Sequence, residues 1–273
     1  MSSSKGETAR VTVRDFQTRK ARGERLVVVT AYDALFGKLV DESGVDSVLV
    51  GDSLGNLLAG YETTLPVTLD QMIYHARSTR AGVKRALLVV DMPFLTYQVS
   101  PQRALMNCGR VMQETGADAV KLEGAKDNIL AAVRAVTGAG IPVMGHLGFT
   151  PQSVLTLGGS RVQARDADGA KQIVEDAKAL EAAGVFSIVL ELVPAKVAAR
   201  VTEAVSVPTI GIGAGASCDG QVLVLHDLLG LNEGFSPKFL KRYASMAAEV
   251  RDAVSRFGSE VRARSYPDDD HSF

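Results

Sequence analysis

The sequence predicts an α/β protein of the (β/α)8 TIM barrel class, built as a single domain. Eight short apolar runs rich in Val, Ile and Leu recur along the chain, amphipathic segments separate most of them, and a glycine tends to close each amphipathic segment. A length of 273 residues with 46% hydrophobic content also suits one barrel. An open, doubly wound sheet is the alternative, favoured if the glycine-rich segment near Gly211 bound a dinucleotide.

In chain order, we expect a flexible N-terminal tail over residues 1–10, a catalytic barrel over residues 11–258 and a disordered, acidic C-terminal tail over residues 259–273. The predicted strands are Leu26–Thr30, Ser47–Gly51, Ala86–Asp91, Ala119–Glu123, Pro142–His146, Phe186–Glu191, Pro208–Gly213 and Val222–His226. The clearest predicted helices are Leu69–Ala81, Gln102–Thr115, Gly169–Ala183 and Pro237–Phe257. The long connection after the second strand should form a loop over the barrel mouth.

Composition argues against several classes of protein. The chain has 30 basic and 31 acidic residues without a Lys/Arg-rich block, which predicts no nucleic acid partner and no anionic membrane partner. The apolar runs are too short to span a bilayer and the N-terminus lacks the apolar core of a signal peptide, so we expect a cytoplasmic protein. Cys108 and Cys218 are expected to be free thiols.

Three acids stand at the C-terminal ends of predicted strands. Asp52, Asp91 and Glu123 end the runs SVLVGD, ALLVVD and AVKLEG, and side chains at the C-terminal ends of barrel strands carry the chemistry of such enzymes. Neighbouring strands lie about 4.8 Å apart, so the three acids can converge on one cation. Hard oxygen donors favour Mg²⁺. The alternative for any one of them is a helix cap.

Three further ionisable residues lie at the same predicted rim. Lys121 shares a strand face with Glu123, and it either pairs with that acid or neutralises a substrate carboxylate, which the excess of acids favours. His146 is either a hydrogen-bonded core residue or a group that orients substrate or cofactor. Glu191 ends the sixth strand, beneath an apolar rim, and is a candidate general base.

Two later segments are ambiguous. GIGAG, at Gly211–Gly215, resembles a phosphate-binding turn, but it lacks the GxGxxG spacing and the Lys-Ser/Thr pair, so a tight loop with close backbone approach is the stronger interpretation. His226 and Asp227 follow the eighth predicted strand, where Asp227 either joins the rim or caps a helix.

Longer strings carry a family resemblance from about Val11 to Phe257. In order along the chain they are TAYDA, GDSLGN, TTLPVTLDQMIYH, DMPFLTYQ, VKLEG, GHLGFTPQS, GIGAG and CDGQVLVLHDLLG, and together they resemble the ketopantoate (3-methyl-2-oxobutanoate) hydroxymethyltransferase family. The resemblance implies a Mg²⁺-dependent barrel enzyme of pantothenate biosynthesis that forms a homo-oligomer, a decamer. It implies hydroxymethyl transfer from 5,10-methylenetetrahydrofolate to 3-methyl-2-oxobutanoate through a Mg²⁺-stabilised enolate, giving 2-dehydropantoate and tetrahydrofolate.

The resemblance also implies roles for individual residues. The metal-site acids fall on Asp52 and Asp91, with Glu123 as the third acidic position, and the catalytic base falls on Glu191. The positions that contact substrate fall on Asp52, Ser53, Asp91, Lys121 and His146. The loop around Ser160–Asp166 lacks the aromatic residue and second glycine expected there, and the tail after Ser265 matches nothing in the family.

Two other functions compete with this one. A lyase or mutase of the phosphoenolpyruvate mutase and isocitrate lyase kind would use a related barrel and an α-keto acid enolate, but the chain lacks the KKCGH-type cysteine loop of the lyases. A barrel that only binds a small acid is permitted by fold alone. The density of ionisable residues at one rim argues against it, because such clusters are costly unless they serve chemistry.

Overall fold

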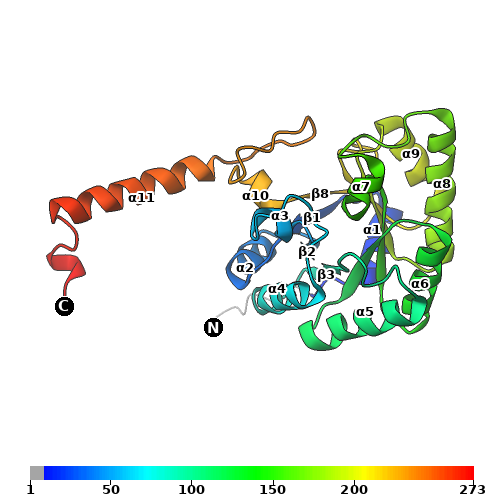
Figure 1. Ribbon diagram of the computed structural model, residues 1–273, viewed down its shortest axis with the longest axis horizontal. Coiled ribbons are helices and arrows are strands. Elements are labelled where there is room, and N and C mark those ends of the chain that lie inside the picture. The colour runs from blue at the N-terminus through cyan, green and yellow to red at the C-terminus, as the bar shows by residue number, and fades with distance from the viewer. Residues whose placement is uncertain (1–8) are drawn as a thin grey trace, which may run out of the picture. The chain divides into compact units, whose positions relative to one another are not determined.

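Eight parallel strands close into a barrel in which each strand pairs with the next in sequence and β8 pairs with β1. The computed structural model describes residues 9–273 (Figure 1), and the predicted tail over residues 1–10 lies almost wholly outside them. The strands are β1 (Leu26–Thr30), β2 (Ser47–Val50), β3 (Leu87–Asp91), β4 (Ala119–Glu123), β5 (Val143–Gly148), β6 (Ser187–Glu191), β7 (Thr209–Ile212) and β8 (Gly220–Leu223). The barrel class is confirmed, and the open-sheet alternative is wrong because the barrel is closed.

The first seven strands lie where the apolar runs predicted them, within two residues at either end. Every residue of β2, β3 and β4 is buried, as expected for strands covered on both faces by side chains or helices. The eighth strand begins earlier than predicted, at Gly220. A Cβ at Gly220 would lie 2.5 Å from the carbonyl oxygen of Leu26, so this pairing needs a glycine, which hydrophobic patterning does not signal.

Helices follow the strands around the barrel, as the labels in Figure 1 show for α4, α5, α6, α8 and α9. The α-helices are α1 (Val13–Arg22), α2 (Ala34–Glu42), α3 (Leu54–Leu57), α4 (Leu69–Gly82), α5 (Pro101–Thr115), α6 (Asp127–Gly138), α7 (Val154–Leu157), α8 (Ala167–Ala182), α9 (Ala195–Ala204), α10 (Leu225–Leu228) and α11 (Met246–Ala263). Two short 3₁₀ helices are η1 (Pro151–Ser153) and η2 (Asp269–His271). The predicted glycine joints are confirmed: Gly116, for example, ends α5 in the left-handed conformation with φ of 68°.

Helix α1 closes the N-terminal end of the barrel, although the sequence analysis did not expect a helix there. Phe16 is fully buried and meets Phe186 edge to face, with ring centroids 5.5 Å apart. It belongs to a core cluster that includes the first residues of several strands, among them Leu26 and Leu87. Most of the remaining residues of α1 are charged or polar, so its apolar periodicity is weak.

Acids that precede strands pair with basic side chains near this closed end. Arg19 of α1 meets Asp46 at 2.6 Å, and Lys20 of the same helix meets Asp219 at 3.0 Å. Asp46 also accepts a hydrogen bond from the amide of Val27. Carboxylates on this side of the barrel therefore hold the fold together.

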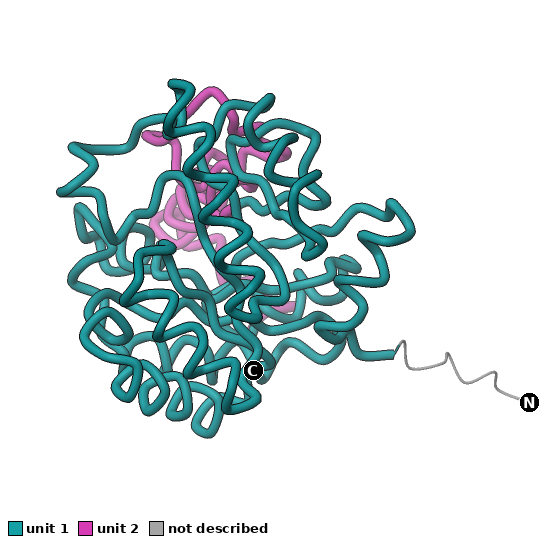
Figure 2. Tube along the Cα trace, turned by 90° about the vertical axis from the view of Figure 1, so that its right-hand side faces the viewer, with its two compact units in different colours: residues 1–223 teal, residues 224–273 magenta. Residues whose placement is uncertain are grey.

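The chain divides into two compact units, Met1–Leu223 and Val224–Phe273, coloured separately in Figure 2. The first contains all eight strands, and the second contains α10, α11 and η2. The predicted catalytic domain over residues 11–258 runs across this boundary, and its bounds stay a prediction.

Helix α11 differs from the predicted helix Pro237–Phe257 at both ends. Before Met246 the backbone is tied to α10 instead, because the amide of Tyr243 donates to the carbonyl of Leu228. The helix continues to Ala263, inside the segment predicted to be disordered, and ends at Arg264 in the left-handed conformation.

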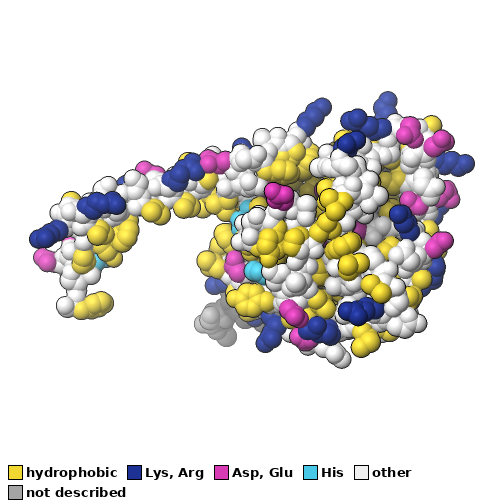
Figure 3. Space-filling view, viewed as in Figure 1, with side chains coloured by type: hydrophobic (Ala, Val, Ile, Leu, Met, Phe, Trp, Pro, Cys, Tyr) yellow, Lys and Arg dark blue, Asp and Glu magenta, His cyan; other side chains and the backbone are white. Residues whose placement is uncertain are grey.

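Charged side chains of both signs cover the face of the barrel drawn in Figure 3. Basic and acidic side chains are interspersed over the barrel helices on that face. In the part of the chain from residue 9 onward, no helix combines the length and apolarity needed to cross a membrane.

Candidate active site

The strand register brings the predicted residues to one rim of the barrel. Asp91 is level with Lys121 across β3 and β4, and Glu123 is level with His146 across β4 and β5. Glu191 ends β6, opposite Gly148 of β5. Since all strands are parallel, these side chains lie at their common C-terminal edge, which is the functional face of such barrels.

Asp52, Asp91 and Lys121 form the first half of the site, and all three are buried. The Lys121 ammonium lies 2.6 Å from Asp91 Oδ1, and the backbone amide of Asp52 donates to Asp91 Oδ2 at 3.1 Å. Gly51 precedes Asp52, and a Cβ there would lie 2.8 Å from Ser53 Oγ. The absence of a side chain at this position therefore leaves room for the hydroxyl of Ser53 beside the acids.

His146 links two glutamates in the second half of the site. Its Nδ1 lies 3.4 Å from Glu123 Oε1, and its Nε2 lies 3.3 Å from Glu191 Oε2. The histidine is 1% exposed, whereas the side chain of Glu191 is 19% exposed at the mouth. A buried imidazole between two carboxylates is favoured in its protonated form, which donates from both nitrogens.

Gln152 and Tyr97 join the two halves, and the sequence analysis did not find either residue. The Gln152 amide nitrogen donates to Asp52 Oδ2 at 2.9 Å, and its backbone amide donates to Glu123 Oε2 at 3.1 Å. The Tyr97 hydroxyl donates to Gln152 Oε1 at 2.9 Å. Tyr97 lies in the loop after β3 and Gln152 in the short helix η1 after β5, where neither hydrophobic periodicity nor a strand end marks them, although they lie within the strings DMPFLTYQ and GHLGFTPQS.

Negative charge is in excess in the first half of the site. Burial, together with the charges of Asp91 and Glu123, raises the pKa of Asp52 to about 8. Burial opposes the charge on Lys121, but the surrounding carboxylates, Asp91 first, outweigh it and raise the pKa of Lys121 above its usual range. One lysine thus lies beside two buried acids in this half, and a bound cation would supply the missing positive charge.

The charges in the second half are better matched. Burial and Lys121 disfavour the imidazolium form, yet contacts with Glu123 and Glu191 prevail and raise the pKa of His146 to about 9. Burial likewise opposes ionisation of Glu123, but the hydrogen bond and charge of His146 lower the pKa of that carboxyl. Glu123 and His146 therefore form an ion pair at neutral pH.

The donor set fits Mg²⁺ through two carboxylates. In the described part of the chain, no three His, Cys, Asp or Glu side chains form a ready metal-binding group. Glu123 is directed to His146 and Gln152, which leaves Asp52 and Asp91 as adjacent hard oxygen donors. Mg²⁺ is commonly held by one or two carboxylates, with water or substrate oxygens completing its coordination. The charge excess around Asp52 suits such an ion.

Ser53 lies beside the acids and is held by a buried tyrosine. Its hydroxyl is 2.8 Å from the hydroxyl of Tyr32, which is 1% exposed, and the backbone carbonyl of Tyr32 contacts His75 Nδ1 at 2.8 Å. The predicted position of Ser53 next to Asp52 thus places a fixed polar group at the edge of the acidic cluster.

The backbone around Glu191 is tightly held. Its carbonyl oxygen accepts a hydrogen bond from Phe149 at 2.8 Å, and a Cβ on Gly148 would come within 2.2 Å of that same oxygen. The next residue, Leu192, has a positive φ of 49°, which is strained for a leucine. The amide of Gln163, from the loop that departs from the family pattern, donates to the Leu192 carbonyl. This loop therefore supports the end of β6.

GIGAG begins within β7, and its Ile212 pairs with Glu191 of β6, so this segment reaches the same rim. A Cβ on Gly215 would meet Ala195, and one on Gly211 would meet Cys218 and Gln221, so the structure supports the tight-loop interpretation of GIGAG. Asp227 lies within α10, in the second unit, and accepts a hydrogen bond from Asn232.

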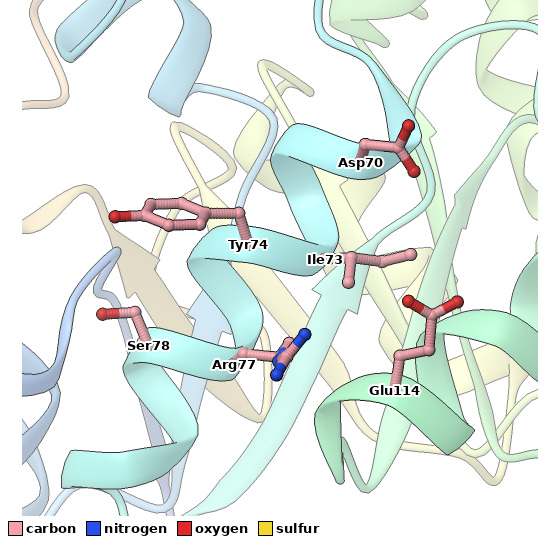
Figure 4. Close-up of a pocket in the computed structure, with 6 residues that line it drawn as sticks. All are labelled: Asp70, Ile73, Tyr74, Arg77, Ser78 and Glu114. Atoms are coloured by element: carbon pink, nitrogen blue, oxygen red, sulfur yellow. The ribbon is translucent and has the colours of Figure 1, made fainter.

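A surface pocket of about 600 Å³ lies away from these residues, on the outer side of α4 and α5 (Figure 4). It is lined by Asp70, Ile73, Tyr74, Arg77, Ser78 and Glu114. Asp70 and Glu114 both pair with Arg110, so its acids are matched by a basic side chain at the surface. The unbalanced, buried charges that indicate chemistry are found at the barrel mouth instead.

Fold and site together define an enzyme of the α/β-barrel class, with a buried acidic cluster at the mouth. The sequence pattern of the family described as ketopantoate hydroxymethyltransferase matches residues 10–269, and the chain belongs to that family. The 3-methyl-2-oxobutanoate hydroxymethyltransferase of Pelobacter propionicus is 54% identical over 264 residues, covering 97% of each chain. That of Moorella thermoacetica is 53% identical and covers 98% of this chain and 99% of its own.

The fold is shared more widely than the family. A putative phosphonomutase from Burkholderia cenocepacia J2315 superposes with a TM-score of 0.65 at 14% identity, covering 88% of this chain and 99% of its own. At that identity the likeness bears on the fold alone.

Proposed function

We propose that this protein transfers a hydroxymethyl group from 5,10-methylenetetrahydrofolate to 3-methyl-2-oxobutanoate, giving 2-dehydropantoate and tetrahydrofolate in pantothenate biosynthesis. The observation that carries the proposal is the buried cluster at the barrel mouth, where three acids and one lysine adjoin a histidine-linked glutamate. This cluster occurs in a chain that is 54% identical to a relative bearing that activity in its name.

In this proposal Asp52 and Asp91 would hold Mg²⁺, and the ion would supply a Lewis acid for the carboxylate and keto oxygens of the substrate. Lys121 stays protonated because of its acidic neighbours and adds a second positive charge beside those oxygens. Ser53, fixed by Tyr32, supplies a hydroxyl for the substrate carboxylate. Glu123 contributes charge to the metal site and holds His146 in place.

Glu191 removes the proton from C3 of 3-methyl-2-oxobutanoate. Its position at the end of β6, more exposed than the other acids, gives it access to a substrate in the mouth. The methylene carbon of the folate loses both of its carbon–nitrogen bonds, to N5 and to N10. A bond to C3 of the substrate and a bond to the oxygen of a water molecule replace them, and the two folate nitrogens take up the proton removed from C3 and one proton from the water. His146 orients Glu191 through its Nε2.

A lyase or mutase is the second candidate, because the phosphonomutase shares the barrel. Sequence identity separates the two candidates: 14% to that protein against 54% and 53% to the named hydroxymethyltransferases. The family resemblance also suggests a homo-decamer, which we propose as the state of this protein. Light scattering should then give ten times the chain mass of 28.9 kDa.

The decisive experiment is an assay with both substrates, run once with Mg²⁺ and once with a chelator, with ketopantoate detected by mass spectrometry. Mg²⁺-dependent product is the expected result. If the folded protein bound Mg²⁺ and gave no ketopantoate but cleaved a 2-alkylisocitrate, a lyase function would replace the proposed hydroxymethyl transfer. If the protein bound 3-methyl-2-oxobutanoate tightly but did not exchange its C3 proton, the result would support a non-catalytic barrel that only binds a small acid.

A further inference from the structure

Gln152 is the residue that touches acids in both halves of the site. It lies in η1, directly after β5, and is 6% exposed. Its side-chain nitrogen donates to Asp52 Oδ2 and to the Met92 carbonyl, each at 2.9 Å. Its side-chain oxygen accepts from the Tyr97 hydroxyl at 2.9 Å and from the Gln98 amide at 3.0 Å. Every hydrogen-bonding position of the amide is thus engaged in a specific direction.

The partners fix which way the amide points. The carbonyl of Met92 only accepts hydrogen bonds, so it must face the NH₂ group of Gln152. The Gln98 amide donates to the other side, where the Gln152 oxygen accepts. In the reversed orientation, the side-chain oxygen of Gln152 would face the Met92 carbonyl and the Asp52 carboxylate. Both of these groups are acceptors, so no hydrogen bond could form to either. Gln152 is therefore locked as a hydrogen-bond donor to Asp52.

This donor fixes one oxygen of Asp52. Oδ2 accepts a hydrogen bond from the Gln152 side chain at 2.9 Å. A carboxylate held by one oxygen cannot rotate freely, so the other oxygen is presented in one direction. Partners that orient ligands in this way raise the affinity of metal sites, and their removal typically weakens binding about 10–100-fold.

The same residue reaches Glu123 through its backbone. The Gln152 amide nitrogen of the main chain donates to Glu123 Oε2, and the Tyr97 hydroxyl accepts from the Glu123 amide while donating to Gln152. The backbone contact survives a change of side chain. Substitution of Gln152 therefore tests the contact with Asp52 separately from the contact with Glu123.

We propose that Gln152, oriented by Tyr97, is a positioning residue that presents Asp52 to a divalent cation and so sets the cation affinity of the site. The inference rests on one part of the proposed function, namely that the rim of the barrel binds a divalent cation. It concerns a residue that contacts neither substrate nor cation, and its effect passes through the orientation of Asp52.

The test is a calorimetric titration of the full chain with Mg²⁺. A second titration uses Mn²⁺, and electron paramagnetic resonance records the spectrum of the bound Mn²⁺. Gln152→Met keeps the length of the side chain and removes its polar atoms, and we expect roughly 10–100-fold weaker binding with a changed Mn²⁺ spectrum. Gln172→Met is the control, because it makes the same substitution on the exposed surface of α8, where Gln172 donates to Asp176. It should bind Mg²⁺ within about threefold of the unmodified protein.

Tyr97→Phe provides a second route should Gln152→Met fail to fold. It removes the hydroxyl that orients the amide and keeps the buried ring, so binding should weaken in the same direction by roughly two- to tenfold. Unchanged affinity in Gln152→Met, or equal weakening in Gln172→Met, would overturn the inference while leaving the proposed reaction intact. Loss of hydroxymethyl transfer in unmodified protein that still binds Mg²⁺ would overturn the reaction and leave the role of Gln152 standing.

Discussion

Aspartate serves two purposes in this barrel, depending on the end of the strand that it occupies. Asp46 and Asp219 precede strands and pair with Arg19 and Lys20, which fastens α1 to the barrel. Asp52, which follows β2, lacks such a matched partner, and its pKa is raised to about 8. The same side chain stabilises the fold at one end and creates an unbalanced site at the other, as expected for active sites that are built at a cost in stability.

The role of Glu191 is tested by the substitution Glu191→Gln. We expect kcat to fall roughly 10²–10⁴-fold, because an amide cannot accept the C3 proton. Mg²⁺ affinity and substrate KM should change little, since Asp52 and Asp91 are untouched. The measurements are steady-state kinetics and deuterium exchange at C3 of 3-methyl-2-oxobutanoate.

The matched control is Glu175→Gln, on the exposed face of α8, where Glu175 pairs only with Lys178. It should retain full activity. Near-normal exchange in Glu191→Gln would remove Glu191 from the role of base and direct attention to His146.

The charged residues of the site were predictable because strand ends mark them. Asp91, Glu123 and Glu191 are the last residues of β3, β4 and β6, as their apolar runs indicate. Their partners were harder to foresee. The position of His146 between two glutamates depends on the register of three strands. Gln152 contacts Asp52, although the two residues are 100 positions apart in the sequence. Such contacts exist only in the folded chain.

At the level of elements, strands were predicted more accurately than helices. Strands of a closed parallel barrel are covered on both sides and read as continuous apolar runs, so β1 and β4 were predicted with their observed bounds. Helix α1 has one buried apolar residue, Phe16, and α11 has one, Ala247, so their patterns gave little signal. Short elements such as η1 depend on tertiary contacts.

Asp41 shows how a helix end can hold a loop, and it provides a test at this scale. It lies near the end of α2, and its carboxylate accepts hydrogen bonds from the backbone amides of Lys84, Arg85 and Ala86, just before β3. Asp41→Asn removes the charge and one acceptor oxygen, leaving buried donors without a good partner. We expect a loss of about 1–3 kcal/mol in the free energy of unfolding, measured by urea denaturation.

The effect should depend on pH. Burial opposes ionisation of Asp41, but the three backbone amides outweigh it and lower the pKa of the carboxyl in the folded protein. Its contribution is therefore fully present above the unfolded pKa of about 3.9 and is lost as pH falls through the lower folded value. Glu42→Gln, at the exposed neighbouring position, should cost about 0–1 kcal/mol. An equal loss in both variants would contradict the assignment.

At the scale of the whole molecule, one barrel supports different chemistries through the side chains at its mouth. The phosphonomutase of Burkholderia cenocepacia shares the barrel at 14% identity, so the architecture by itself does not select a reaction. The rim residues lie wholly within the first compact unit, Met1–Leu223. Binding of a cation there should therefore stabilise that unit.

Thermal unfolding with and without Mg²⁺ tests this expectation. A ligand that binds only the folded state adds about 2.7 kcal/mol at a concentration of 100 times Kd, which in a chain of this size corresponds to a rise of roughly 5–10 °C in the Tm. Asp91→Asn should lose the Mg²⁺-dependent rise, because it removes one of the two carboxylate ligands. Asp70→Asn, at a side chain that is 82% exposed, should keep it. If Mg²⁺ left the Tm unchanged, or if the rise persisted in Asp91→Asn, we would conclude that these acids have a purely structural role. If the rise occurred only in proteins that keep both Asp52 and Asp91, the ion needed for the proposed chemistry would also stabilise the barrel.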